Sequence, residues 1–393
     1  MSIHKTILFL GDGMADEPIA ELGGKTPLEY AKTPAMDAIA RNGRSGTLLT
    51  LPDGYPTSSD VANMSVLGGN LATEMCGRGP LEAASQNIKL GPYDVCFRMN
   101  LVTVDDQGIL RDFSGGHISQ KEAQEKIDLL NKEIGTDSIR FHSGVSYRNL
   151  LILSGKEYSS EVAYDKPDDN SGNPVAEHLP RAKKPEAEHT VAVLRDLIAK
   201  ASKVLAGDHA NGIWPWSGGR SGAIHQLETR YGIRSAVISA VDVINGLGRC
   251  MGMDVIPVKG ATGFVDTNYE GKADAAIEAL KDHDFVYVHI EATDEVSHLQ
   301  DMKLKIQAIE DFDQRLIGRV MKAVPADTTF VVLPDHPVPL RIGKHTRTPV
   351  PVAVWRPGLA PDEVTAYNEK DALHGSLGQL SGSDLMDLLF ERI

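Results

Sequence analysis

Carboxylates at three distant places in the chain each follow shortly after an apolar run. They are Asp12, Asp294 and Asp335, and the runs before them are 6–10, 285–290 and 330–333. Each run has the length and the β-branched or aromatic content of a buried strand in a parallel sheet. Open α/β sheets bind ligands just beyond the carboxyl ends of their strands. The three carboxylates therefore predict a polar cleft at one edge of a sheet.

Histidines stand close in sequence to two of these carboxylates. Asp294 and His298 are four residues apart, so one helical turn after the strand would place both on one face. His336 follows Asp335 directly, and His345 comes shortly before another apolar run. Mixed Asp and His ligation suits Mn²⁺ or Zn²⁺, whereas Mg²⁺ is less natural where imidazole is a ligand. Two such ions stabilise the attacking and leaving oxygens of a phosphoryl group, so the pattern predicts a two-metal phosphoryl-transfer site.

Each motif taken alone has a simpler explanation. Asp294 and His298 could be a solvated pair on a helix surface, and Gly11-Asp12-Gly13 or Asp335-His336-Pro337 could be plain turns. The joint occurrence of these motifs, each at a predicted strand end, favours the metal site over those explanations.

Ser59 is the candidate nucleophile. It stands in the predicted first turn of a helix over 60–67, where backbone N–H groups and the helix dipole favour a phosphate. The alternative is that Thr57, Ser58 and Ser59 only cap that helix. A serine without a histidine base needs a metal ion to hold its alkoxide, which the neighbouring candidates could supply. If Ser59 is not the nucleophile, Ser58 is the next candidate.

Composition narrows the classes of partner. The chain has 393 residues, 41% hydrophobic and 24% charged, with a formal net charge of −14. This charge argues against broad binding to nucleic acid or an anionic membrane, while a small phosphorylated substrate remains compatible with it. The start of the chain does not have the pattern of a signal peptide, and no apolar stretch reaches membrane-spanning length. We therefore expect a cytoplasmic protein, and the oligomeric state is left open.

The strand and helix patterns indicate two domains. Strand–helix alternation occupies residues 1–85 and returns over 255–393, whereas 86–254 has a different pattern of short strands, a loop and two helices, near 119–134 and 187–205. Since ligand candidates lie on both sides of the middle segment, we interpret 86–254 as an insertion into one discontinuous metal-binding domain. In that domain, Thr33-Pro34 and Asn42-Gly43 predict the two ends of a helix.

These motifs match a known family over nearly the whole chain. The chain resembles the cofactor-independent phosphoglycerate mutases, specifically the shorter archaeal type, within the alkaline phosphatase superfamily. The matching stretches are Gly11-Asp12-Gly13-Met14-Ala15-Asp16, 24–29, Ser59-Asp60-Val61-Ala62-Asn63, 77–84, Gly115-Gly116-His117-Ile118-Ser119, 260–263, 292–295 with His298, and 335–336 with His345. The resemblance implies an α/β fold, with an alkaline-phosphatase-like core, a central mostly parallel sheet and a smaller inserted α+β lid domain.

The resemblance also implies roles for the site residues. Ser59 would become phosphorylated while 2-phosphoglycerate and 3-phosphoglycerate interconvert, and the lid would exclude water. Two divalent metal ions are implied, Mn²⁺ first, with Zn²⁺, Co²⁺ or Mg²⁺ as alternatives, and no bisphosphoglycerate. One ion would be held by Asp12, Ser59, Asp335 and His336, and the other by Asp294, His298 and His345.

Substrate contacts are candidates from the same resemblance. His117 resembles the histidine that serves the substrate hydroxyl or phosphate, and Arg148, Arg98 and Lys259 are candidate anion contacts, because a guanidinium suits phosphate and carboxylate. The ordinary alternative for such cations is solvation at the surface.

The segment 211–220, with Trp214 and Trp216, departs from the archaeal pattern. A bacterial subgroup with a similar segment has been proposed to be a homoserine kinase. The tryptophans could form a pocket wall, although buried packing is the more common use of Trp. The alternatives are therefore a phosphotransferase acting on another small alcohol, a metal-dependent phosphatase, or a metal-stabilised binding protein. The chain has no Gly-x4-Gly-Lys-Ser/Thr loop, which argues against ATP without excluding it.

Overall fold

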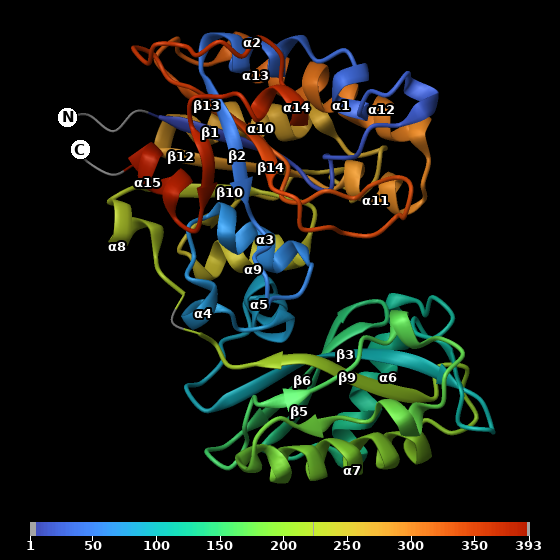
Figure 1. Cartoon of the computed structure of the whole chain (residues 1–393). Coiled ribbons are helices and arrows are strands. Elements are labelled where there is room, and N and C mark those ends of the chain that lie inside the picture. Colours follow the sequence, from blue (N-terminus) through green and yellow to red (C-terminus); the bar gives the residue numbers. More distant parts are fainter. Residues whose placement is uncertain (1–4, 223, 391–393) are drawn as a thin grey trace. The chain divides into compact units, whose positions relative to one another are not determined.

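The computed structural model describes residues 5–222 and 224–390. The chain splits into two compact units, a larger one formed by residues 1–75 and 224–393 and a smaller one formed by residues 76–223 (Figure 1). Each unit is described by itself. The expectation about a signal peptide depends on the first residues, and residues 1–4 lie outside the described part.

The larger unit is built on an eight-stranded, mostly parallel sheet with the order β11-β10-β12-β1-β13-β14-β2-β15. The neighbours from β11 to β13 pair in parallel, whereas β14 is antiparallel to both β13 and β2. The strands are β1 (Thr6–Gly11), β2 (Arg44–Leu49), β10 (Ser235–Ile238), β11 (Asp254–Val255), β12 (Phe285–Ile290), β13 (Thr329–Leu333), β14 (Val350–Trp355) and β15 (Gly378–Ser381).

The central strands of this sheet are buried throughout because helices cover both of its faces. On one face of the sheet the main core is formed by strand residues such as Ile7, Phe9 and Val288, which pack against α2, α10 and the α12–α13 region. The other face is covered by α3, α9 and α15 (Figure 1). The helices are α1 (Pro27–Tyr30), α2 (Pro34–Asn42), α3 (Ser59–Val66), α4 (Leu71–Glu74), α8 (Leu227–Tyr231), α9 (Asp242–Cys250), α10 (Tyr269–Asp282), α11 (Ala292–His298), α12 (Met302–Asp311), the π-helical η5 (Phe312–Ile317), α13 (Gly318–Ala323), α14 (Glu369–Ala372) and α15 (Asp384–Phe390).

The three strands predicted to end at carboxylates are neighbours in the sheet. β1 lies between β12 and β13, with Leu10 in register with His289 on one side and Leu333 on the other. Because all three run in the same direction, their carboxyl ends meet at one edge of the sheet. The predicted α/β fold is confirmed, with parallel strands that are followed closely by Asp12, Asp294 and Asp335.

The smaller unit is an α+β structure. A five-stranded sheet has the order β4-β3-β6-β5, and β9, which lies off this path, pairs antiparallel with residues 96–102 of β3. One face, including Phe97 and Leu151, packs on α6 and α7, where the sequence predicted two helices. The elements are α5 (Arg78–Ser85), β3 (Asp94–Val104), β4 (Leu110–Asp112), α6 (Gln120–Ile134), β5 (Ile139–Val145), β6 (Arg148–Ser154), β7 (Val162–Ala163), β8 (Arg181–Ala182), α7 (Glu188–Val204) and β9 (Gly212–Gly219).

The unit boundaries differ from the predicted ones. The smaller unit comprises 76–223 rather than 86–254. Helix α5 belongs to it because Gly79 lies against the backbone of Cys96 in β3. β10 belongs to the larger sheet because it pairs with β12. In the larger unit, the two places where the chain leaves and returns are joined by Glu74, whose carboxylate lies 2.8 Å from Nδ1 of His225.

Two helices in the larger unit begin without a side-chain hydrogen bond from their N-cap residue. The helix predicted from Thr33-Pro34 to Asn42-Gly43 is α2, but the Thr33 side chain does not cap it. Instead the Asp313 carboxylate accepts hydrogen bonds from the backbone N–H groups of Met36 and Ala35, at 2.7 and 3.2 Å. Similarly, Ser58 is the N-cap of α3 without a side-chain hydrogen bond.

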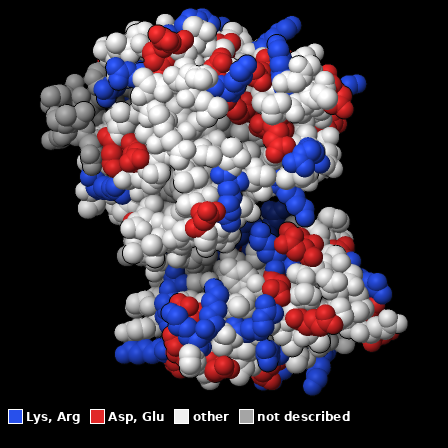
Figure 2. Space-filling view, viewed as in Figure 1, with Lys and Arg blue, Asp and Glu red and all other residues white. Residues whose placement is uncertain are grey.

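The surface carries charges of both signs. Figure 2 shows acidic and basic side chains scattered over the viewed face of each unit. Among the described residues, the helices are either too short or too polar to cross a membrane.

Candidate metal centre and phosphoryl-transfer site

A tight turn after β1 brings Asp12 beside the residues that follow β13. Gly13 has φ +61, and its N–H donates to Oδ1 of Asp335 at 3.1 Å. A Cβ at this glycine would lie 2.6 Å from Oδ1 and 2.8 Å from Cα of Asp294. The residue after Asp12 must therefore be a glycine, both for its backbone conformation and for the close approach of α11.

The first cluster surrounds the imidazole of His336. Its Nε2 lies 3.3 Å from Oγ of Ser59, 3.3 Å from Oδ1 of Asp12 and 3.4 Å from Oδ2 of Asp335. Asp12, Asp335 and His336 are fully buried, and Ser59 is buried at the first position of α3. These are the residues predicted to hold one ion.

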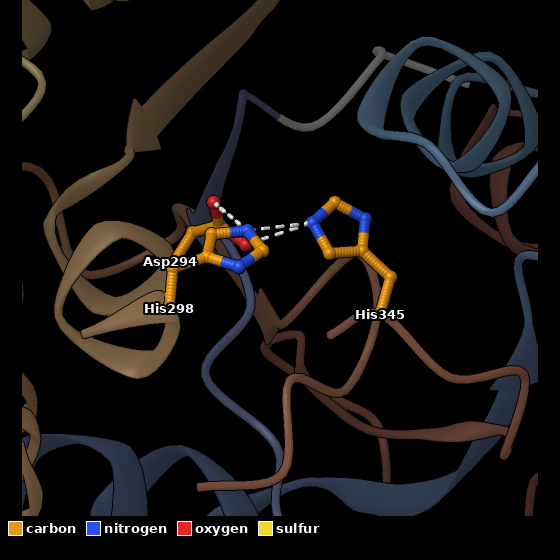
Figure 3. Close-up of side chains that lie close together, drawn as sticks. All are labelled: Asp294, His298 and His345. Carbon is orange, nitrogen blue, oxygen red and sulfur yellow. Dashed lines mark hydrogen bonds and ion pairs between the residues drawn. The ribbon is translucent and has the colours of Figure 1, made fainter. Parts of the chain in front are cut away.

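The second cluster is formed by Asp294 and His298 on α11 together with His345 (Figure 3). Nε2 of His298 lies 3.2 Å from Oδ2 of Asp294 and 3.0 Å from Nε2 of His345, which lies 3.4 Å from Oδ1 of Asp294. Nδ1 of His298 is 2.8 Å from the Gly343 carbonyl oxygen, which fixes the ring. One helical turn aligns Asp294 and His298, as the spacing predicted.

The two clusters adjoin. The rings of His336 and His345 stack with centroids 3.9 Å apart. Ligand atoms of Asp12, Asp294 and His336 also lie within 4.8 Å of one another. All the predicted metal ligands and Ser59 therefore converge in the larger unit, although their role as ligands stays a prediction.

Burial and crowding perturb the titration of these groups. Burial, followed by the charges of Asp335 and Glu291, raises the pKa of Asp12 well above its usual value. Burial likewise raises the pKa of Asp335 to about 7. Burial also acts to raise the pKa of Asp294, but the neighbouring imidazoles of His298 and His345 outweigh it, so this pKa is low. The same Asp294 contact raises the pKa of His298 to about 9.

The donor set fits a pair of divalent cations. Among the described residues, Oδ1 of Asp12, Oδ1 of Asp294, Nδ1 of His336 and Nδ1 of His345 are buried without a hydrogen-bond partner. Buried polar atoms are normally satisfied, and several carboxylates crowded out of water require positive charge. Mixed carboxylate and imidazole donors suit Mn²⁺ or Zn²⁺ better than Mg²⁺.

A buried ion pair supports the loops that carry these residues. Nζ of Lys305 lies 2.8 Å from Oδ2 of Asp16 and 3.0 Å from the Val338 carbonyl oxygen, and both charged side chains are buried. The N–H of Val338 donates to the Ala15 carbonyl oxygen at 3.1 Å. The segment after β1 is thereby held against the segment after β13.

Several polar residues behind the clusters were not identified from the sequence. His289 on β12 lies with Nε2 2.9 Å from Oδ2 of Asp12, and burial lowers its pKa to about 3, so the ring is neutral. Asn63 on α3 donates to Asp335 and accepts a hydrogen bond from the Tyr287 hydroxyl on β12. The Thr293 hydroxyl donates to the Asp12 carbonyl oxygen. The available signal was that Tyr287 and His289, two residues apart in an otherwise apolar strand, must share one face.

The candidate substrate contacts lie in different units. Lys259 is exposed in the larger unit, whereas His117 and Arg148 are exposed in the smaller one. Arg98 is buried and pairs with Glu82 at 2.8 Å, so its charge already has a partner. Burial lowers the pKa of Arg98, and the nearby charges of Arg78 and Arg148 act in the same direction.

The tryptophans of β9 are packed inside the smaller unit. Trp214 and Trp216 are 5% and 4% exposed, and Nε1 of Trp216 donates to Oδ1 of Asn100 at 3.0 Å. The guanidinium of Arg98 lies 4.9 Å from the centroid of the Trp216 ring. In this structure the segment supports Arg98 and closes a hydrophobic cluster, the commoner use of buried Trp.

A comparison with models of protein families identifies the superfamily of this chain. The model described as the Metalloenzyme superfamily matches residues 4–392, so the chain belongs to that superfamily. This agrees with the carboxylate and imidazole clusters found at the carboxyl edge of the sheet.

Individual relatives give the family within it. The chain is 45% identical to the 2,3-bisphosphoglycerate-independent phosphoglycerate mutase of Methanosarcina acetivorans, over 98% of this chain and 99% of that protein. A solved protein of Pyrococcus horikoshii has a TM-score of 0.83 at 28% identity, covering 99% and 97% of the two chains. The cofactor-independent phosphoglycerate mutase of Thermoplasma acidophilum has a TM-score of 0.69 at 27% identity, covering 98% and 99%. The chain therefore belongs to the family of 2,3-bisphosphoglycerate-independent phosphoglycerate mutases.

Proposed function

We propose that the protein interconverts 2-phosphoglycerate and 3-phosphoglycerate through a phosphoserine at Ser59. The main support for this proposal is the position of the Ser59 hydroxyl. Ser59 begins α3, and its Oγ lies 3.3 Å from Nε2 of His336 within the first cluster. A helix start offers free backbone N–H groups to a phosphate, and the neighbouring donors supply the ligands that a metal-activated serine requires.

In this proposal the phosphoryl group is transferred in two steps, first to Ser59 and then back to glycerate. Ser59 Oγ, having lost its proton to solvent, forms a bond to phosphorus while the bond to one substrate hydroxyl oxygen breaks and that oxygen takes a proton. The other glycerate hydroxyl then attacks the phosphoserine, loses its proton and releases Ser59. Two divalent cations held by the clusters, Mn²⁺ in our proposal, would supply positive charge that favours the serine alkoxide and the transferring phosphoryl group.

Substrate recognition belongs to the proposal as well. We assign Arg148, His117 and Lys259 as contacts to the phosphate, carboxylate or hydroxyl groups of the substrate, since they are exposed and cationic or polar. Arg98 would act from its buried pair with Glu82. No bisphosphoglycerate is needed in this scheme, and water must be excluded while the phosphoserine exists. A glycolytic role would place the protein in the cytoplasm.

Two assays distinguish the possible acceptors of the phosphoryl group. Mn²⁺-loaded protein is incubated with 3-phosphoglycerate, and we expect 2-phosphoglycerate to form without added bisphosphoglycerate and without free phosphate. A second assay supplies homoserine and ATP. Turnover only in the second assay, or release of phosphate alone, would overturn the mutase in favour of a phosphotransferase or a phosphatase.

Two serine variants test the nucleophile. Ser59→Ala should abolish transfer with an unchanged circular dichroism spectrum, because the hydroxyl is lost and the helix start is kept. Ser58→Ala is the matched control, since the Ser58 side chain makes no cap hydrogen bond. Activity retained in Ser59→Ala and lost in Ser58→Ala would reassign the nucleophile.

A further inference from the structure

Strand β12 presents two polar side chains to the site from a position where apolar residues are normal. Tyr287 and His289 are both fully buried, and strand alternation places them on the same face. His289 reaches Asp12, whereas Tyr287 lies further from the strand end and contacts Asn63. The chemistry proposed above uses neither Tyr287 nor Asn63.

The hydrogen bonds of Asn63 connect the nucleophile to a metal-ligand candidate. Its Nδ2 donates to the backbone carbonyl oxygen of Ser59 at 2.9 Å and to Oδ2 of Asp335 at 2.9 Å. Asn63 stands one turn after Ser59 on α3 and is fully buried. This amide therefore ties the first turn of α3 to the segment after β13, in the cluster where the Ser59 hydroxyl must be held.

The chemistry of the partners fixes which way the amide points. A backbone carbonyl and a carboxylate only accept hydrogen bonds, so both N–H groups of Asn63 must face them. Its Oδ1 then faces Tyr287, whose hydroxyl must donate. Burial and the charges of Asp335 and Asp12 raise the pKa of Tyr287, which keeps the donating proton in place.

The two acceptors select this orientation, and the Tyr287 hydroxyl completes it by donating to Oδ1 of Asn63. With the amide turned by half a rotation, Oδ1 would face the Asp335 carboxylate and the Ser59 carbonyl, and two acceptors would be opposed. With the hydroxyl gone, Oδ1 of Asn63 loses its donor in a buried position, and unsatisfied buried acceptors are costly.

We propose that Tyr287 is a positioning residue for phosphoryl transfer, acting through Asn63 on Ser59 and Asp335. This inference rests on the proposed function of Ser59. Within the described part of the chain the Tyr287 hydroxyl donates to Asn63 and to neither the nucleophile nor the proposed ligands, so its effect is on their placement. Partners behind metal ligands commonly change metal affinity or activity by about 10–100-fold when they are removed.

The experiment compares two tyrosines that differ in what their hydroxyls contact. Tyr287→Phe removes only the hydroxyl that donates to Asn63. Tyr269→Phe is the matched control, because Tyr269 is also fully buried in the larger unit but its hydroxyl has no hydrogen-bond partner among the described residues. Melting temperature, Mn²⁺ affinity by calorimetric titration, kcat and KM are measured for the full-length protein and both variants.

We expect Tyr287→Phe to lower kcat or Mn²⁺ affinity about 10–100-fold with KM for 3-phosphoglycerate within about twofold, and Tyr269→Phe to leave all three within about twofold. The double variant Tyr287→Phe/Asn63→Ala should lose no more than Asn63→Ala alone, because one chain of contacts carries both effects.

The inference is overturned if Tyr287→Phe matches the wild type in kcat and Mn²⁺ affinity, or if it changes only the melting temperature. A wild type that binds Mn²⁺ but does not interconvert phosphoglycerates would sink the proposed function instead. In that case the titration still decides, because unchanged Mn²⁺ affinity in Tyr287→Phe would overturn the positioning of Asp335 as well.

Discussion

Replacing Gly13 by alanine tests whether the turn after β1 must be this close to α11. Two costs are expected. A non-glycine residue at φ +61 costs about 1–2 kcal/mol in backbone conformation. The added Cβ would also meet Cα of Asp294 at 2.8 Å and Oδ1 of Asp294 at 2.6 Å. A backbone atom cannot yield as a flexible side chain does, so α11 or the turn must move by several tenths of an ångström.

The displacement should appear in function more than in stability. Misplacement of about 1 Å near a reacting centre costs on the order of 10²-fold in rate, so we expect Gly13→Ala to lower kcat about 10- to 100-fold and to weaken Mn²⁺ binding. The assays are phosphoglycerate turnover, calorimetric Mn²⁺ titration and urea denaturation.

Gly23 supplies the matched control for the backbone term. It has φ +71, and a Cβ there would meet nothing within 4 Å. Gly23→Ala should therefore share the conformational cost of about 1–2 kcal/mol but leave turnover and Mn²⁺ affinity unchanged. Equal effects of the two substitutions on turnover would refute the reasoning, because the contact with Asp294 would then contribute nothing.

Three other perturbations follow from the same structure. Lys305→Met leaves Asp16 buried without its partner and should cost about 3–5 kcal/mol in urea denaturation. Arg341→Met, which breaks an exposed pair with Glu17, should leave the urea midpoint nearly unchanged. Burial raises the pKa of Asp313 to about 6, above its unfolded value, so the contribution of this group to stability is present below about pH 4 and is lost as pH rises through 6. The free energy of unfolding of the wild type, relative to that of Asp313→Asn, should therefore fall by about 3 kcal/mol between pH 4 and 7. A difference that does not change with pH would contradict this. Removal of metal by EDTA should abolish turnover and lower the melting temperature, and Mn²⁺ at about 100 times its Kd should restore about 2.7 kcal/mol of stability; an identical melting curve with and without Mn²⁺ would argue against the site.

The strand ends could be predicted because the relevant information is local. Each apolar run encodes a buried strand, and the residue type at its end is visible in the sequence. The parallel order β12-β1-β13 then brings Asp12, Asp294 and Asp335 together. The four-residue spacing of Asp294 and His298 predicted their shared helix face for the same local reason.

Contacts between distant segments could not be predicted in this way. Asn63 looks like any polar helix residue until α3 packs against β12, where Tyr287 and Asp335 meet it. Arg98 was expected as an anion contact, but the fold pairs it with Glu82 from the neighbouring helix. The boundary near residue 254 was wrong because β10 has only four residues, and its membership is decided by pairing with β12, fifty residues later.

The contact between Glu74 and His225 has a consequence for how the two units could be separated. Because these side chains meet at 2.8 Å, the two ends left by excising 76–223 lie within the reach of a linker of a few residues. A short splice could rejoin them without stretching the backbone, and every proposed cation ligand would remain in the shortened polypeptide. A deletion of 76–223 would thus allow metal binding by the proposed ligands to be measured without the part of the chain that carries Arg98 and Arg148.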